Sequence, residues 1–134
     1  MIIPFFQRVD KPWGYEFIFT PAGAPTTAKM LHLNALCRFS LQYHEQKVET
    51  LILVKGRAKI FFGSDKDNLT EEEMVPNKGY YIQKKMVHRL QAITDCDVFE
   101  SSTSEAGTTV RLEDDYKRED ETEEERIQNR KKIA

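Results

Sequence analysis

Four side chains with nitrogen or oxygen donors suggest a metal site. His44, Gln46 and Glu49 lie within six positions, and His88 follows far along the chain. On an extended strand, residues two apart such as His44 and Gln46 point to the same side. Two imidazoles, a carboxylate and an amide oxygen suit a divalent Mn, Fe, Co, Ni or Zn ion with open positions for a substrate. By itself, this spacing leaves open both a metal site and solvated polar residues at a strand end.

Three of these donors lie in residues 36–56, which read as two strands joined by a turn. Residues 37–44 alternate between apolar and polar side chains, and this period of two predicts a strand. Residues 45–47 form a polar turn. The apolar run at residues 51–54 then predicts a second strand that stops at Gly56.

A metal site in this stretch requires its polar face to line an interior pocket. That face carries Arg38, Ser40, Gln42 and His44, so the apolar face of the same strand must be covered from outside. A patch of four large exposed apolar side chains is unusual on a monomer. We expect the apolar N-terminal residues 2–6, of this chain or of a second copy, to cover it, and we therefore predict a homodimer.

The rest of the chain predicts one all-β domain followed by a charged tail. The 134 residues fit a single domain. About eight or nine short strands, spaced near ten residues apart and separated by turn residues, favour a sandwich or barrel. From Glu119 the acidic residues come first and the basic ones last, which suits a helix dipole. We expect a β-barrel domain at residues 1–118 and a helical tail at residues 119–134, either solvated and frayed or bound to a partner.

Composition excludes several classes of protein. The formal net charge of −2 argues against a general nucleic-acid binder. No apolar run approaches the roughly 20 residues that cross a bilayer, and the first residues lack the basic start of a secretory signal. Two cysteines do not make a disulfide framework. We expect a cytoplasmic protein that binds neither a membrane nor nucleic acid.

Three blocks of sequence resemble one branch of the cupin superfamily, the cupin domain of mannose-6-phosphate isomerases and mannose-1-phosphate guanylyltransferases. Residues 11–16, KPWGYE, resemble that branch's R-P-W-G block. Residues 38–49, RFSLQYHEQKVE, resemble R-L-S-L-Q-x-H-H-H-R-x-E, and residues 110–118, VRLEDDYKR, resemble V-R-x-E-D-x-Y-G-R. Residues 76–88 resemble the second cupin motif, so the likeness runs in order from residue 11 to residue 118.

This resemblance implies an all-β, cupin-type jelly-roll β-barrel with a metal at its mouth and a short C-terminal helix. The implied metal ligands are His44, Gln46, Glu49 and His88. Basic residues that could hold a sugar phosphate are Lys29, Arg38, Lys47 and Arg111, and the implied borders of the site are Trp13 and Tyr116. The chain departs from the family at Gln46, where the family has histidine, and at Lys47, where it has arginine. An amide oxygen is a poorer ligand than imidazole for Zn but adequate for a harder ion such as Mn.

The activity implied by the resemblance is aldose–ketose isomerisation of a sugar phosphate. The ion would polarise the sugar's oxygens, and a base would move a proton between neighbouring carbons. The candidate bases are Lys47, Glu45 and a hydroxide held by the ion. One alternative is a metal-free sugar or nucleotide-sugar isomerase or epimerase with His44 as base. Another is a cupin that binds a sugar or other small molecule without turnover.

Overall fold

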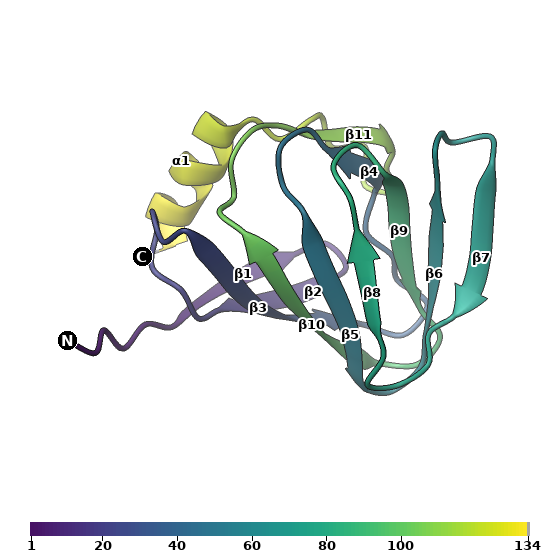
Figure 1. The fold of residues 1–134 in the computed structure, drawn as a ribbon, viewed down its shortest axis with the longest axis horizontal. Helices are drawn as coiled ribbons and strands as arrows, with labels where there is room; N and C mark the ends of the chain where they lie inside the picture. Colours follow the sequence, from purple (N-terminus) through teal and green to yellow (C-terminus); the bar gives the residue numbers. More distant parts are fainter. Residues whose placement is uncertain (134) are drawn as a thin grey trace.

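A computed structural model describes residues 1–133, and the side chains of residues 1–130. Eleven strands and one helix make up this part of the chain (Figure 1). They are β1 (Gln7–Lys11), β2 (Gly14–Ile18), β3 (Thr26–Leu33), β4 (Leu41–His44), β5 (Glu49–Lys55), β6 (Ala58–Gly63), β7 (Leu69–Glu73), β8 (Gly79–Ile82), β9 (Val87–Ala92), β10 (Cys96–Thr103), β11 (Thr109–Glu113) and α1 (Glu123–Ile133). No helix among residues 1–133 has the length and apolar character needed to cross a membrane.

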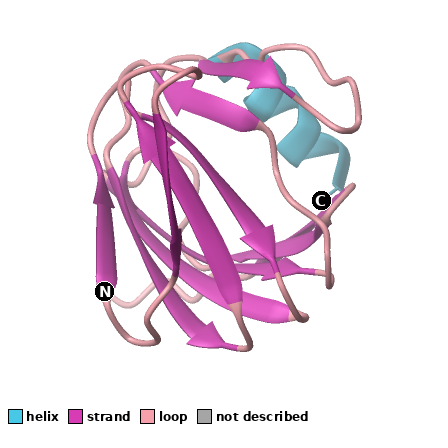
Figure 2. Cartoon of the chain, turned by 90° about the vertical axis from the view of Figure 1, so that its right-hand side faces the viewer, coloured by secondary structure: helices cyan, strands magenta, loops and turns pink. Residues whose placement is uncertain are grey.

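The strands form two antiparallel sheets. One sheet has the order β1-β2-β3-β10-β5-β8, and the other has the order β11-β4-β9-β6-β7. Pairs such as β3 with β10 and β4 with β9 join segments far apart in the sequence, which is the pattern of a jelly roll. Figure 2 shows the strands wrapping around a common interior, with α1 against one side. This architecture confirms the predicted all-β jelly-roll barrel with a short C-terminal helix.

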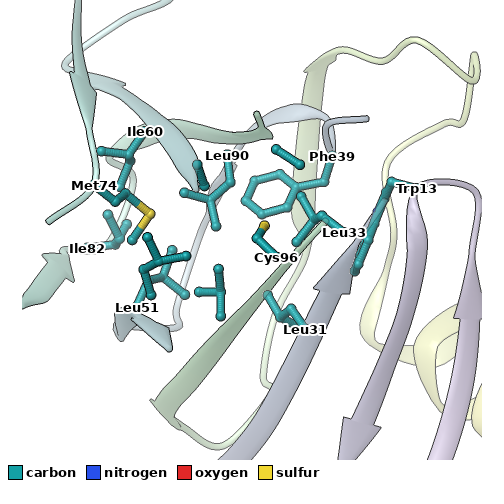
Figure 3. Packing of buried hydrophobic residues seen from close by; sticks show 14 residues of the cluster. Trp13, Leu31, Leu33, Phe39, Leu51, Ile60, Met74, Ile82, Leu90 and Cys96 are labelled. Carbon is teal, nitrogen blue, oxygen red and sulfur yellow. The ribbon is translucent and has the colours of Figure 1, made fainter. Parts of the chain in front are cut away.

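The hydrophobic core fills the space between the sheets. Leu33, Leu51, Ile60, Leu90 and Val98 are each at most 1% exposed, and several of them meet in the packing shown in Figure 3. They alternate with outward-facing residues along their strands, as the period of two requires. This packing fixes the strands from which the polar interior residues project.

The strand predicted over residues 37–44 is interrupted. Arg38 makes only an isolated bridge to Gln91, and β4 begins at Leu41. Phe39 belongs to the hydrophobic core and lines the cavity described below, as do Gln42 and His44. The interior face therefore changes from odd to even positions within this segment. The polar face does not point inward along its whole length, and the apolar face that needs an outside cover is shorter than predicted.

The C-terminal helix begins at a capping box. The backbone nitrogen of Glu125 donates to Thr122 Oγ1 at 3.1 Å, and the Thr122 nitrogen donates to Glu125 Oε2 at 3.4 Å. Residues just before the helix pair with the barrel, through the bridge between Thr109 and Glu121. The tail expected at residues 119–134 thus lies against the barrel over most of its length, while Ala134 lies outside the described residues.

Candidate metal centre and ligand cavity

Three residues of the predicted metal site converge inside the barrel. His44 ends β4, Glu49 begins β5, and His88 lies in β9, which pairs with β4. One ligand atom from each residue lies within 4.8 Å of the other two, and all three residues are buried. Glu49 Oε1 is 3.0 Å from His88 Nε2 and 3.4 Å from His44 Nε2. Three different strands therefore present donors to one point.

Hydrogen bonds orient both imidazoles toward this point. His88 Nδ1 is 2.9 Å from the carbonyl oxygen of Met86, which can only accept, so the proton is on Nδ1 and the Nε2 lone pair faces the centre. His88 Nε2 is fully buried and has no hydrogen-bond partner among the described residues. His44 Nδ1 similarly contacts Thr109 Oγ1 at 3.0 Å. Such outer contacts are typical of metal-binding histidines, and the residues fit a divalent ion.

The charge states at the centre also suit a metal. Burial lowers the pKa of His44 to about 4, and the charge of Lys47 adds to this effect. Burial would raise the pKa of Glu49, but the charge of Lys47 holds it well below its usual range. At neutral pH the imidazole of His44 is neutral and the carboxyl of Glu49 is ionised, as metal ligation requires.

The structure places Gln42, and not Gln46, beside His44. Gln46 is exposed, and its side chain packs where a Cβ atom on Gly107 would lie. Gln42 Nε2 is 3.4 Å from His44 Nε2, and Gln42 Oε1 accepts a hydrogen bond from Ser40 Oγ at 2.6 Å. Gln42 precedes His44 by two positions on the same strand, and this spacing was the signal in the sequence that could have identified it.

A cavity of about 90 Å³ opens from the centre toward α1. Seven basic and five acidic side chains line it, so its wall carries a positive excess although the chain has a net charge of −2. The basic residues are Lys11, Lys29, Lys47, Arg111, Arg118, Arg126 and Arg130, and the acidic ones are Glu16, Glu49, Glu100, Glu105 and Glu121.

Two buried lysines, Lys29 and Lys47, form ion pairs with four acidic groups of the cavity. Lys47 Nζ lies 3.2 Å from both Glu49 Oε2 and Glu100 Oε2. Lys29 Nζ lies 3.4 Å from Glu16 Oε1 and forms an ion pair with Glu105. An isolated buried charge is costly, so this alternation of charges is what keeps the ionised groups inside the barrel.

Glu100 differs from its neighbours in its affinity for protons. Burial raises its pKa to about 7, and the charge of Glu49 adds to the effect although Lys47 opposes it. Burial would lower the pKa of Lys47, but the charges of Glu100 and Glu49 raise it, so Lys47 stays protonated near neutral pH. Among these three groups, Glu100 is the one able to exchange a proton near pH 7. Sequence reasoning missed it, although it shares the inward face of its strand with Val98 and Ser102.

The other predicted site residues are divided between the cavity and the surface. Lys29, Arg111 and Trp13 line the cavity. Glu45 is exposed and does not line it. Arg38 points away from the cavity and forms a two-pronged ion pair with Asp115, at 2.7 and 2.8 Å. Tyr116 is half-buried and packs against the hydrophobic core.

Residues 3–120 match the family described as Mannose-6-phosphate isomerase C-terminal. The chain belongs to this family. The match spans every strand of the barrel and includes His44, Glu49 and His88, but it ends before α1. No curated protein matches this cupin chain by sequence.

Solved structures share the fold of this cupin at low sequence identity. The capsular polysaccharide assembling protein CapF from Staphylococcus aureus has a TM-score of 0.67 and 13% identity, over 87% of this chain and 34% of CapF. KdgF from Halomonas sp. has a TM-score of 0.61 and 14% identity, over 74% of this chain and 86% of KdgF. Bacillus subtilis oxalate decarboxylase, with Mn(II) centers, has a TM-score of 0.61 and 16% identity, over 73% of this chain and 27% of that one. The chain thus spans about a third of the length of CapF.

Proposed function

We propose that this cupin is a metal-dependent sugar-phosphate isomerase that interconverts an aldose and a ketose. The observation that carries the proposal is the convergence of His44, Glu49 and His88 on one buried point, with both Nε2 atoms turned toward it. Manganese is a suitable ion because the set includes a hard carboxylate and a nearby amide, and iron, cobalt, nickel and zinc are the other candidates. The family and the sugar-related name of CapF support a carbohydrate ligand.

An ion held by these three residues would polarise the carbonyl and hydroxyl oxygens of an open-chain sugar and stabilise the negative charge that develops on them. Glu100 would carry the proton between the two neighbouring carbons, because its pKa of about 7 allows both uptake and release. Lys47 remains a cation, which holds Glu100 in place, and is a poor base. Glu45, the other base suggested by the sequence, is exposed and outside the cavity.

Two histidine variants test this function. Purified protein should contain a stoichiometric transition metal by elemental analysis, and it should isomerise at least one member of a panel of sugar phosphates. His88→Ala should lose both the metal and the turnover. His32→Ala is the matched control, because His32 pairs with Asp97 at 2.7 Å, away from the cavity, and should change neither.

Each alternative predicts a different result in the same experiment. Full metal content and activity in His88→Ala would refute the proposed centre. Turnover that survives exhaustive chelation would favour a metal-free isomerase or epimerase. Saturable binding of a sugar phosphate by calorimetry, without turnover of any member of the panel, would favour a binding cupin.

The proposal includes a homodimer. Met1, Ile2, Ile3 and Phe6 are at least 62% exposed, and Figure 1 shows the N-terminal segment leading away from the barrel. Phe6 contacts Phe17 on β2, with ring centroids 5.0 Å apart. A second copy would cover this apolar segment. Light scattering should give twice the mass of one chain, and removal of residues 1–5 should shift the protein to the monomer.

A further inference from the structure

Helix α1 is joined to the barrel through two arginines. Arg126 Nε lies 3.1 Å from Glu121 Oε1, and Arg126 Nη1 donates to the carbonyl oxygen of Glu105 at 2.9 Å. Arg130 Nη1 lies 3.0 Å from Glu105 Oε2. The large apolar side chain of residues 123–130, Ile127, is 48% exposed, so polar contacts and not apolar burial hold this part of the helix.

These contacts make α1 a cover that can be lifted. A helix of 11 residues has little stability of its own, and the ion pairs of Arg126 and Arg130, whose side chains are 13% and 18% exposed, are polar contacts that the charge of a ligand can replace. The cavity beneath it has about 90 Å³, against roughly 300–1,000 Å³ for typical ligand pockets. A sugar phosphate needs more room than this, and movement of α1 would supply it. The helix begins beyond residue 120, where the family match ends, so this cover lies outside the family's segment.

A carboxylate of the chain itself lies among three cations at the edge of this cover. Arg126 contacts Glu121 as described, and Arg111 Nη2 is 4.0 Å from Glu121 Oε2. Burial would raise the pKa of Glu121, but the charges of Lys11, Arg126 and Arg111 lower it. Lys11 Nζ also lies 4.0 Å from Glu16 Oε1, so three cations face two carboxylates and a positive excess of one remains. The backbone of Glu121 is fixed by two hydrogen bonds to Thr109, at 2.9 and 3.0 Å, so its side chain can leave while the backbone stays.

One donor at this position has no acceptor. Arg111 Nε is buried and has no hydrogen-bond partner among the described residues, although Arg111 Nη1 donates to the carbonyl oxygen of Glu119 at 2.6 Å. Burial lowers the pKa of Arg111 and the charge of Arg118 lowers it further, while the charges of Glu121, Asp114 and Asp120 raise it. Asp114 and Asp120 also lie near, but Asp114 is bound to Arg118 at 2.8 Å and Asp120 to the backbone nitrogen of Arg111 at 2.7 Å.

We propose that Lys11, Arg111 and Arg126 form a phosphate subsite, that the carboxylate of Glu121 occupies it in the free protein, and that α1 lifts to let the ligand's phosphate replace it. A phosphate dianion compensates the three cations better than one carboxylate does, and it offers an acceptor to Arg111 Nε. Arg126 then closes over the bound phosphate from the lid. This inference shares one assumption with the proposed function, which is that the cavity binds a phosphate ester.

Two substitutions with opposite expected effects test the subsite. Inorganic phosphate is titrated into protein kept metal-free by a chelator, at constant ionic strength, and binding is followed by calorimetry and by ³¹P NMR. Arg126→Ala should weaken phosphate binding by roughly tenfold or more, the effect of losing a charge-assisted hydrogen bond. Glu121→Gln should tighten it by roughly tenfold, because the competing charge is gone. Loss of structure cannot produce a gain of affinity.

A surface ion pair supplies the matched controls. Arg57 and Glu73 are paired at 2.6 Å far from the cavity, so Arg57→Ala and Glu73→Gln should leave phosphate binding unchanged. If Arg57→Ala and Arg126→Ala weakened phosphate binding equally, the effect would be one of general surface charge and the proposed subsite would be wrong. The absence of saturable phosphate binding to the unmodified protein would overturn it too, as would tighter binding of acetate than of phosphate.

Hydrogen exchange tests the lid. Backbone amides of α1 should exchange much faster than those of β9 in the free protein, and phosphate should slow exchange in α1 but not in β7. Exchange in α1 as slow as in the core strands, unaffected by phosphate, would refute the lid. Because no metal is present in these measurements, their outcome is independent of the metal content and turnover that test the isomerase.

Discussion

Replacing Glu100 with glutamine should change how the stability of the protein depends on pH. The pKa of Glu100 is about 7 in the folded protein, against an ordinary value of 4.5. Between pH 4.5 and 7, the folded protein therefore holds a proton that the unfolded chain has lost. The free energy of unfolding falls as pH rises through this window, by about 3 kcal/mol for the full difference.

His44 acts in the opposite direction over nearly the same range. Its pKa is about 4 when folded and 6.5 ordinarily, so the unfolded chain holds the extra proton between pH 4 and 6.5. The free energy of unfolding consequently rises with pH through this window, again by about 3 kcal/mol. In the unmodified protein these two slopes nearly cancel. In Glu100→Gln only the rise due to His44 remains.

Urea unfolding at a series of pH values, with a chelator present, measures both curves. The difference between the free energies of unfolding of the unmodified protein and of Glu100→Gln should change by about 3 kcal/mol from pH 4.5 to 7.5. Loss of the contact with Lys47 adds a constant to this difference and does not alter the change. Glu73→Gln is the control, because Glu73 is exposed and its pKa is lowered by the hydrogen bond with Arg57. Parallel curves for the unmodified protein and Glu100→Gln would contradict the assignment of a raised pKa to Glu100.

Three further substitutions follow from the packing and the hydrogen bonds. Leu90→Ala removes a fully buried side chain and should lower the free energy of unfolding by about 2–5 kcal/mol, whereas Ile127→Ala should change it by less than about 0.5 kcal/mol, as measured by urea unfolding. Thr122→Ala removes the helix cap and should cost about 1 kcal/mol, seen as faster hydrogen exchange in α1 and not in the barrel. Thr109→Val removes the partner of His44 Nδ1 and should weaken Mn²⁺ affinity by about 10–100-fold in a calorimetric titration, while Thr70→Val on the outer hairpin should not.

The barrel could be predicted from sequence because its strands alternate strongly. Residues 26–33 and 96–103 bury every second side chain, and a period of two is visible without any structure. Turn residues mark where most strands end, but the roughly eight or nine strands predicted fall short of the eleven observed, because a strand such as β7 buries no alternate side chains. The pairing of β3 with β10 joins residues some 70 positions apart and was not predicted, because periodicity within a strand does not identify its partner.

The site was harder to predict because small irregularities decide which side chains enter the barrel. The change of face between Phe39 and Gln42 moved Arg38 to the surface, and no period-based argument shows such a break. Gln46 followed His44 by the right spacing but lies beyond the end of β4, which is at His44, so the period of two no longer applies. Buried acids such as Glu100 look like ordinary polar positions until a partner from another strand is found.

Strand β7 ends one of the two sheets, and its sequence Leu69–Glu73 contains three consecutive glutamates. An edge strand presents unpaired backbone groups that can recruit a strand from another molecule, and like charges along the edge prevent this. Lys59 and Arg57 contact Glu71 and Glu73, while Glu72 is exposed between them. The charge that keeps neighbouring molecules from joining edge to edge thus disappears when these carboxylates are protonated. Self-association through β7 should therefore increase in acid.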